Sequence, residues 1–156
     1  MISDERRQLV DNIRIAIAEE KTEETVLRVA AELIDGFSEG YNWTGFYMMR
    51  GDHLEVGPYI GPETEHTKID LSSGICGAAA SQKETVLVDD VKSDERFLAC
   101  SLTTRSEIVV PLMDGSVCMG EIDIDSDQPA HFGREDKEML EEVAVLVVER
   151  LKEINS

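Results

Sequence analysis

The apolar residues of this chain follow a helical period at both ends and a strand-like period between them, which restricts the folds that it can adopt. Ser3 begins an amphipathic segment that extends to about residue 20. Thr22 to Asp35 repeat the pattern as far as Gly36, a residue type common at helix ends. A third helical pattern covers residues 134–154. Helices at both ends that enclose a meandering sheet predict an α+β domain with an antiparallel sheet.

The middle of the chain carries the strand patterns and the turns between them. The Gly51-Asp52 and Asp114-Gly115 pairs are typical of hairpin turns. The small-residue run from Ile75 to Ala80 predicts a short helix that packs closely on the sheet. The expected strands cover Trp43 to Met49, Leu54 to Ile60, Thr85 to Val88, Ile108 to Met113 and Val117 to Ile124.

No repeat, low-complexity tract or linker divides the 156 residues. We therefore expect a single domain over residues 1–156, with N-terminal helices over 1–36, the sheet and a pocket over 42–126 and the C-terminal helix over 134–154. A chain of this length buries roughly 70% of its unfolded surface, so it needs no disulfide or structural metal to hold a core.

The chain carries 33 acidic and 15 basic side chains, which gives a formal net charge of −18. This charge repels nucleic-acid phosphates and anionic lipid headgroups, so neither nucleic acid nor a membrane is expected as a partner. The longest apolar run, Val143 to Val148, is too short to span a membrane, and the first residues lack the features of a signal peptide. We expect a cytoplasmic protein.

Acidic residues alternate along the last expected strand, where Glu121, Asp123 and Asp125 share one face. Glu107, at the start of the preceding strand, can approach the end of this face if the two strands form a hairpin. Converging carboxylates repel one another, so at least one is expected to stay protonated near neutral pH while the others hold a cation. The alternative is a solvated sheet face in a very acidic protein.

The three cysteines are too few and too widely spaced for a disulfide framework or a structural zinc site, so we expect no metal and no cofactor. Cys118 alternates in phase with Ile122 and Ile124, which predicts a buried structural side chain. Two interpretations of Cys76 are open: a thiolate favoured by the start of the short helix, or a small side chain packed among alanines. Cys100 lies in an irregular polar stretch, where an exposed and reactive thiol is expected.

Five motifs together are familiar, although each is short. They are Asn42 to Tyr47 (NWTGFY), Gly74 to Gly77 (GICG), Ala99-Cys100, Ser106 to Leu112 (SEIVVPL) and Asp123 to Ser126 (DIDS). In combination they resemble the free methionine-(R)-sulfoxide reductase family of GAF domains, from about Asn42 to the C-terminal helix. The resemblance implies a central antiparallel sheet flanked by helices, including the two terminal ones, and a pocket that encloses a small ligand.

The resemblance also implies a thiol-dependent reaction. In this family a cysteine, here Cys100, attacks the sulfoxide sulfur of free methionine sulfoxide, and the resulting sulfenic acid is resolved to a disulfide that thioredoxin reduces. The residues that match the substrate site are Glu107, Asp123 and Asp125, which bind the ammonium group and assist protonation of the sulfoxide oxygen. Trp43 would cover the methyl group and Tyr47 would complete that wall, whereas residue composition alone leaves open whether Trp43 only fills the core.

One departure from the family pattern concerns the resolving thiol. The family usually carries a cysteine ten positions before Cys76, where this chain has His66. Either Cys76 takes over the resolving role, or the domain only binds a ligand. The alternative functions are therefore a non-catalytic GAF ligand-binding module, with a homodimer formed through the terminal helices, and a redox sensor with a regulatory disulfide between Cys76 and Cys100.

Overall fold

One antiparallel sheet occupies the centre of the protein in the computed structural model, which describes residues 2–95 and 103–156. The strands lie side by side in the order β3, β2, β1, β6, β5 and β4. Both expected hairpins, β1 with β2 and β5 with β6, form, and pairing of β1 with β6 joins them, which confirms the α+β class. The strand bounds are Trp43–Arg50 (β1), His53–Ile60 (β2), Lys68–Asp70 (β3), Val86–Val88 (β4), Ser106–Asp114 (β5) and Val117–Ser126 (β6).

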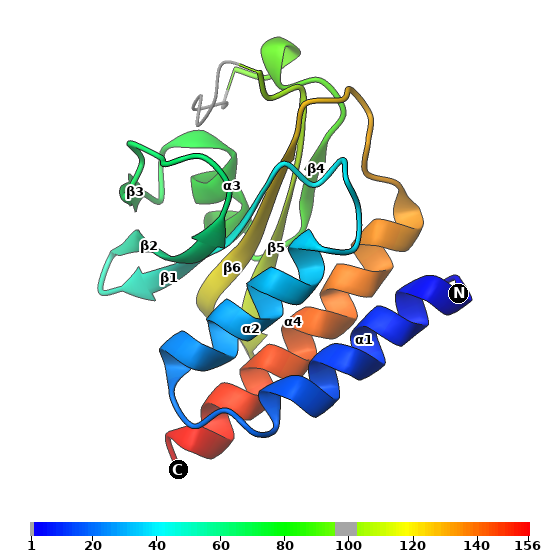
Figure 1. Cartoon of the computed structure of the whole chain (residues 1–156). Helices are drawn as coiled ribbons and strands as arrows, with labels where there is room; N and C mark the ends of the chain where they lie inside the picture. The colour runs from blue at the N-terminus through cyan, green and yellow to red at the C-terminus, as the bar shows by residue number, and fades with distance from the viewer. Residues whose placement is uncertain (1, 96–102) are drawn as a thin grey trace.

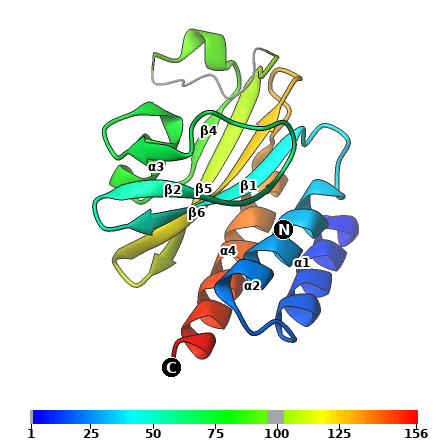
Figure 2. The ribbon, with the colours of Figure 1, turned by 60° about the vertical axis from the view of Figure 1, so that its left-hand side comes forward.

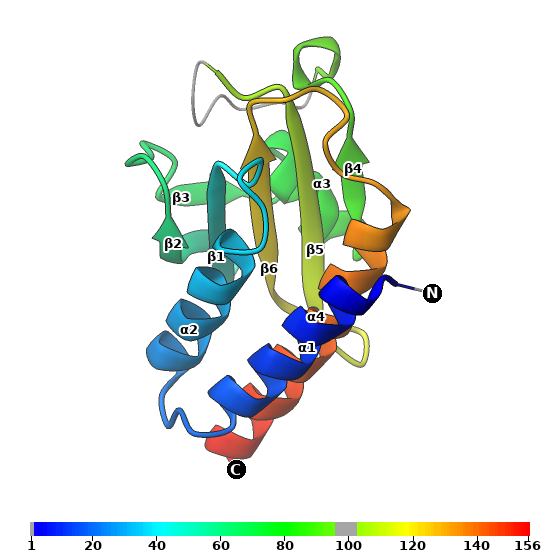
Figure 3. The same ribbon diagram turned by 45° about the vertical axis from the view of Figure 1, so that its right-hand side comes forward.

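Helices cover both faces of the sheet. The three long helices α1 (Asp4–Ile17), α2 (Glu23–Asp35) and α4 (Arg134–Ile154) form a layer on one face (Figure 1). The short helix α3 (Gly74–Gln82) lies on the opposite face, behind the sheet when the terminal helices are in front (Figure 3). A single 3-10 turn, η1 (Val91–Ser93), follows β4. Among the described residues, no helix has the length and apolar character that crossing a membrane requires.

Helices α1 and α2 begin where the sequence predicts them, because the residue before each helix caps an exposed backbone amide. The Ser3 hydroxyl accepts a hydrogen bond from the backbone N–H of Arg6 at 3.3 Å. The Thr22 hydroxyl accepts one from the backbone N–H of Thr25 at 3.1 Å. Capping and an apolar face act together here, so the sequence is sufficient to place these two helix starts.

Helix α3 packs on the sheet through small residues. A Cβ atom at Gly77 would lie 2.7 Å from the carbonyl oxygen of Asp70 and 2.9 Å from that of Leu71, so only glycine fits this close approach. Ala79 and Ala80 are buried on the same helix. The close packing holds the first turn of α3, which carries Cys76, next to β5 and β6.

The sheet lies between α3 and the three long helices (Figure 2). An apolar cluster fills the space on each side of it. The larger cluster fills the space between the sheet and the three long helices and includes Phe46, Ile122 and Ile124. The smaller cluster lies on the α3 side and includes Trp43, Tyr47 and Cys76 among its buried members. We call this second side the α3 face.

The structure differs from the expected sheet at two points. Strand β3 was not expected, because three residues are too few to show a period. Cys118 was expected beside Ile122 and Ile124, but it is only partly buried and packs against the cluster of the α3 face. The reason is a β-bulge, which shifts the register between Leu112 and Met113 and reverses the alternation of β6 at its start.

Candidate active site

Four carboxyl side chains form a row on the α3 face of the sheet. Glu121, Asp123 and Asp125 alternate along β6, and Glu107 of β5 pairs directly with Asp125 across the hairpin. None of the four is more than 4% exposed. The alternative of a solvated acidic face is therefore wrong, and the hairpin brings Glu107 to the acids as expected.

Strand β1 places its aromatic side chains opposite this row of acids. In the pairing of β1 with β6, Trp43 lies opposite Asp125 and Tyr47 lies opposite Glu121. Side chains two residues apart on a strand share a face, so the aromatic rings and the carboxyl groups belong to the same surface of the sheet. Trp43 is 3% exposed and Tyr47 is fully buried.

The indole of Trp43 is held on both sides by other rings. It stacks on Tyr47 with ring centroids 6.0 Å apart and on Tyr59 of β2 with centroids 5.0 Å apart. Gly45 leaves room for the ring, since a Cβ atom there would lie 2.8 Å from the indole. Tyr59 was not identified from the sequence, because the bulge that pairs it with Gly45 shifts the register of the hairpin.

Two hydrogen bonds fasten the loop between β2 and β3 over these rings. The Trp43 indole N–H donates to the carbonyl oxygen of Pro62 at 3.1 Å. The Tyr47 hydroxyl donates to the carbonyl oxygen of His66 at 2.9 Å. His66, which replaces the usual cysteine of the family, therefore lies in a loop tied to the aromatic wall.

Burial determines the protonation of the acids. It raises the pKa of Glu107 well above its ordinary value, and the nearby carboxyls of Asp123 and Asp125 raise it further. Burial also raises the pKa of Glu121 and of Asp125 well above the ordinary range, with Asp123 adding to both shifts. Burial and mutual repulsion therefore favour protonated carboxyls in this row, which is the direction that the converging carboxylates predict.

Cys76 touches this row directly. Its Sγ donates a hydrogen bond to Oδ2 of Asp123 at 3.3 Å, and the residue is 6% exposed. Burial raises the pKa of the Cys76 thiol well above its usual value, and the charges of Asp123 and Glu121 raise it further. The interpretation that the helix start favours a thiolate here is wrong, because burial and neighbouring acids act in the opposite direction.

The row of acids has no compensating cation within the described part of the chain. With all four carboxyls ionised, Oδ1 of Asp123 and both oxygens of Glu121 and Asp125 are buried there without a hydrogen-bond partner. Unpaired buried charge is costly. The arrangement suits a ligand that carries a positive group, or at least one shared proton when that ligand is absent.

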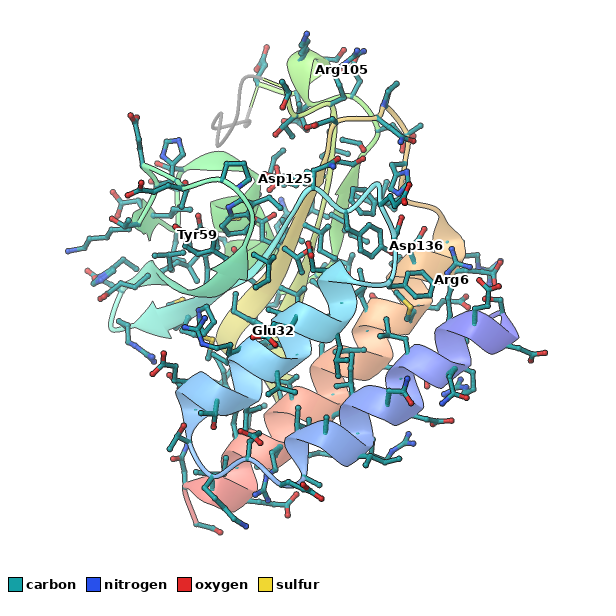
Figure 4. All side chains as sticks on the ribbon, viewed as in Figure 1. Arg6, Glu32, Tyr59, Arg105, Asp125 and Asp136 are labelled. Atoms are coloured by element: carbon teal, nitrogen blue, oxygen red, sulfur yellow. The ribbon has the colours of Figure 1, made fainter. Side chains whose placement is uncertain are left out.

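A cavity of about 220 Å³ opens at the Asp125 end of the row, with Trp43, Pro62 and Thr103 among its lining residues. Figure 4 shows Asp125 between the strand that carries Tyr59 and the segment that carries Arg105. This volume is below the roughly 300–1,000 Å³ of pockets for drug-sized ligands. Of the four acids in the row, Asp125 alone lines the cavity. Two larger hollows, of about 460 and 580 Å³, lie elsewhere and contain none of the four acids.

The structure brings together six of the seven residues that the sequence singled out. Cys100 is the seventh, and it lies outside the described residues. Thr103, three positions later, lines the cavity beside Trp43. Glu121 is the one acid of the row that the family resemblance does not assign to the substrate site, although the alternation along β6 places it on the same face as Asp123. The residues brought together are Trp43, Tyr47, Cys76, Glu107, Asp123 and Asp125.

Known proteins match this chain at three levels: a domain family, individual relatives and solved structures. Residues 21–151 match the GAF domain family. The free methionine-R-sulfoxide reductase of Saccharomyces cerevisiae is 41% identical over 111 residues, and that of Escherichia coli is 33% identical over 102 residues. These alignments cover 68% and 65% of this chain, and the chain spans only 61% of the length of each of the two relatives.

Among solved structures, one similar protein is the free methionine-R-sulfoxide reductase of Neisseria meningitidis, determined in complex with its substrate. It superimposes with a TM-score of 0.92 at 32% identity, over 99% of this chain and 95% of that one. The similarity extends over the whole fold and includes the face that carries the row of acids.

Proposed function

Because this chain belongs to the free methionine-R-sulfoxide reductase family of GAF domains, we propose that it reduces free L-methionine-(R)-sulfoxide to methionine. The observation that carries the proposal is the row of buried, unpaired carboxyls opposite an aromatic wall. Such a surface suits a small ligand with an ammonium group at one end and an apolar methyl group near the other.

The choice of a free amino acid follows from the charge of the site. Asp123 and Asp125 bind the ammonium group, which a methionine sulfoxide within a peptide lacks, and Glu107 faces the sulfoxide oxygen. A buried site that is built to pair with a charged group rejects an analogue without it, because its own groups are then left unpaired. Trp43 and Tyr47 cover the methyl and sulfoxide end of the substrate.

The reducing thiol in this proposal is Cys100, which is assigned from the family motif. Its sulfur attacks the sulfoxide sulfur, the sulfur–oxygen bond of the substrate breaks, and the oxygen remains on Cys100 as a sulfenic acid. Glu107 supplies the proton that the sulfoxide oxygen needs, since burial and the carboxyls of Asp123 and Asp125 raise its pKa and favour its protonated form. Methionine leaves as the two-electron reduced product.

Cys76 resolves the sulfenic acid. Its sulfur forms a disulfide with Cys100, and the sulfur–oxygen bond of the sulfenic acid breaks. The Cys76 thiol proton passes to Asp123, which accepts its hydrogen bond, and from the row of acids to the departing hydroxyl group, which leaves as water. Thioredoxin then reduces the disulfide and restores both thiols. This cycle requires a reducing compartment, which fits the expected location in the cytoplasm.

The test is a single-turnover experiment on the Cys76→Ser variant with thioredoxin as the reductant. We expect it to release about one equivalent of methionine and then to stop, because a sulfenic acid without a resolving thiol offers thioredoxin no protein disulfide to attack. Peptide mapping of the oxidised parent should identify a disulfide between Cys76 and Cys100. A disulfide between Cys100 and Cys118, or full turnover by the variant, would show that the resolving thiol is misassigned.

A further inference from the structure

Three side chains on the α3 face lie at the spacing of metal ligands. One ligand atom from each of Cys76, Glu107 and Asp123 lies within 4.8 Å of the other two, and all three residues are buried. They come from α3, β5 and β6, which are distant in sequence. The spacing of the cysteines in the sequence therefore does not predict this set of ligands.

The distances fit a small tetrahedral ion. Sγ of Cys76 lies 3.3 Å from Oδ2 of Asp123. In a tetrahedral zinc site with zinc–sulfur bonds of about 2.3 Å and zinc–oxygen bonds of about 2.1 Å, neighbouring sulfur and oxygen ligands lie about 3.6 Å apart. These two atoms therefore need to move apart by only a few tenths of an ångström, and a ligand oxygen of Glu107 lies within 4.8 Å of both residues' ligand atoms.

A second observation points to a cationic ligand in the same place. With the carboxyls ionised, as a bound cation requires, Oδ1 of Asp123 and both oxygens of Glu121 are buried and lack hydrogen-bond donors within the described residues. The charge of Glu121 also raises the pKa of the Cys76 thiol. Among those residues, no lysine, arginine or histidine forms an ion pair with Glu107, Glu121 or Asp123.

We propose that Cys76, Glu107 and Asp123 bind a divalent ion of the zinc type, and that this ion and free methionine sulfoxide exclude each other. One thiolate with carboxylate oxygens suits Zn²⁺, Co²⁺ and Cd²⁺, whereas Mg²⁺ and Ca²⁺ require oxygen ligands in larger number. Glu121 or water completes the coordination. The ion occupies the space that the proposed function gives to the substrate ammonium, so its binding inhibits the reductase.

Cobalt is the probe, because a bond between a thiolate and Co²⁺ gives a charge-transfer band in the near ultraviolet. Titration of the reduced full-length protein under anaerobic conditions should produce this band with one cobalt per chain. We expect Cys76→Ser to abolish the band and Asp123→Asn to weaken cobalt binding at least tenfold. Cys118→Ser and Cys100→Ser are the matched controls and should keep the band, and circular dichroism checks the fold of each variant.

Further measurements separate the alternatives. Zn²⁺ should displace the cobalt, and an excess of Mg²⁺ should not. The metal site is overturned if the parent protein gives no band. It is also overturned if the band survives in Cys76→Ser or disappears in either control variant. In the Cys100→Ser variant, which cannot turn the substrate over, free methionine sulfoxide should displace cobalt. If cobalt binds through Cys76 but is not displaced, the metal site stands, while mutual exclusion and the proposed position of the substrate ammonium are wrong.

Discussion

At the scale of single residues, burial of the carboxyl groups determines what the site can bind. Asp123 is the central group, because it accepts the Cys76 thiol hydrogen bond and shifts the pKa of Glu107, Glu121 and Asp125. A positively charged ligand offsets this accumulation of negative charge. The same charge keeps the Cys76 thiol protonated until its proton is taken up by the row.

The first prediction concerns the acids that bind the ammonium group and protonate the sulfoxide oxygen of the substrate. Glu107→Gln and Asp123→Asn should each lower kcat/KM for free methionine-(R)-sulfoxide at least tenfold, which is about 1.4 kcal/mol of transition-state stabilisation. Asp52→Asn is the control, because the Asp52 side chain is fully exposed on the turn after β1 and should leave kcat/KM unchanged. N-acetylation of the substrate should also lower the rate. Equal kcat/KM values for the parent and both site variants would show that these acids take no part in the reaction.

Sequence patterns predict much of this residue set, but not its protonation. Alternation along β6 identifies Asp123 and Asp125, and a single hairpin turn brings Glu107 to them. The position of Cys118 could not be predicted, because one bulged residue reverses the alternation. The raised pKa of Cys76 could not be predicted either, because it results first from burial and then from acids on strands distant in sequence.

At the scale of elements, the close approach of α3 to the sheet positions Cys76 beside Asp123. Capping residues and turn pairs are local signals, so the starts of α1 and α2 and both hairpins follow from the sequence. The order of the strands depends on contacts between distant segments, such as the pairing of β1 with β6, and no local pattern shows it.

The second prediction tests the packing of α3. Within a helix, glycine to alanine ordinarily stabilises by about 1 kcal/mol. At Gly77 the added Cβ atom would meet two backbone carbonyls, so Gly77→Ala should instead lower the free energy of unfolding by about 1–3 kcal/mol. Gly36→Ala, at the end of α2, is the matched control, since its φ is −71° and the nearest atom is 3.5 Å from the new Cβ. Urea unfolding measures both, and a gain in stability for Gly77→Ala would contradict the close approach.

The third prediction concerns Asp136, which joins the starts of α1 and α4 to the segment before β1. Its carboxylate accepts hydrogen bonds from the Tyr41 hydroxyl at 2.6 Å and the Gly133 backbone N–H at 2.9 Å, and it pairs with Arg6 at 3.1 Å (Figure 4). Asp136→Ala leaves these donors unpaired, so it should cost about 2–4 kcal/mol. Glu135→Ala, at the exposed neighbouring position, should cost under about 1 kcal/mol. Urea unfolding measures both variants. Similar losses of unfolding free energy in the two would show that the buried contacts of Asp136 contribute little.

At the scale of the whole molecule, the row of acids makes stability depend on pH. An acid with a raised pKa in the folded state binds a proton that the unfolded chain has already lost. Its stabilising contribution is complete below the unfolded pKa of about 4 and is lost as the pH rises toward the folded pKa. The ligand-free protein should therefore become less stable between acidic and mildly alkaline pH.

The fourth prediction isolates this effect with Glu121→Gln, which resembles a permanently protonated Glu121. The burial that raises the pKa of Glu121 implies that the variant gains stability over the parent as the pH rises, by up to about 1.4 kcal/mol per pH unit. Urea unfolding of both proteins at pH 5.5 and pH 8 measures the difference. General charge repulsion affects both proteins alike, so parallel pH profiles would show that Glu121 is ionised in the folded protein.

The most direct measurement is reduction of the two diastereomers of free methionine sulfoxide by the purified protein with dithiothreitol. We expect the (R)-sulfoxide to be converted to methionine and the (S)-sulfoxide to remain, because one orientation of the sulfoxide oxygen faces Glu107 when the ammonium group is held by the acids. Cys100→Ser should be inactive even with excess dithiothreitol. No conversion of the (R)-sulfoxide by the parent, or undiminished conversion by Cys100→Ser, would contradict the proposed reductase.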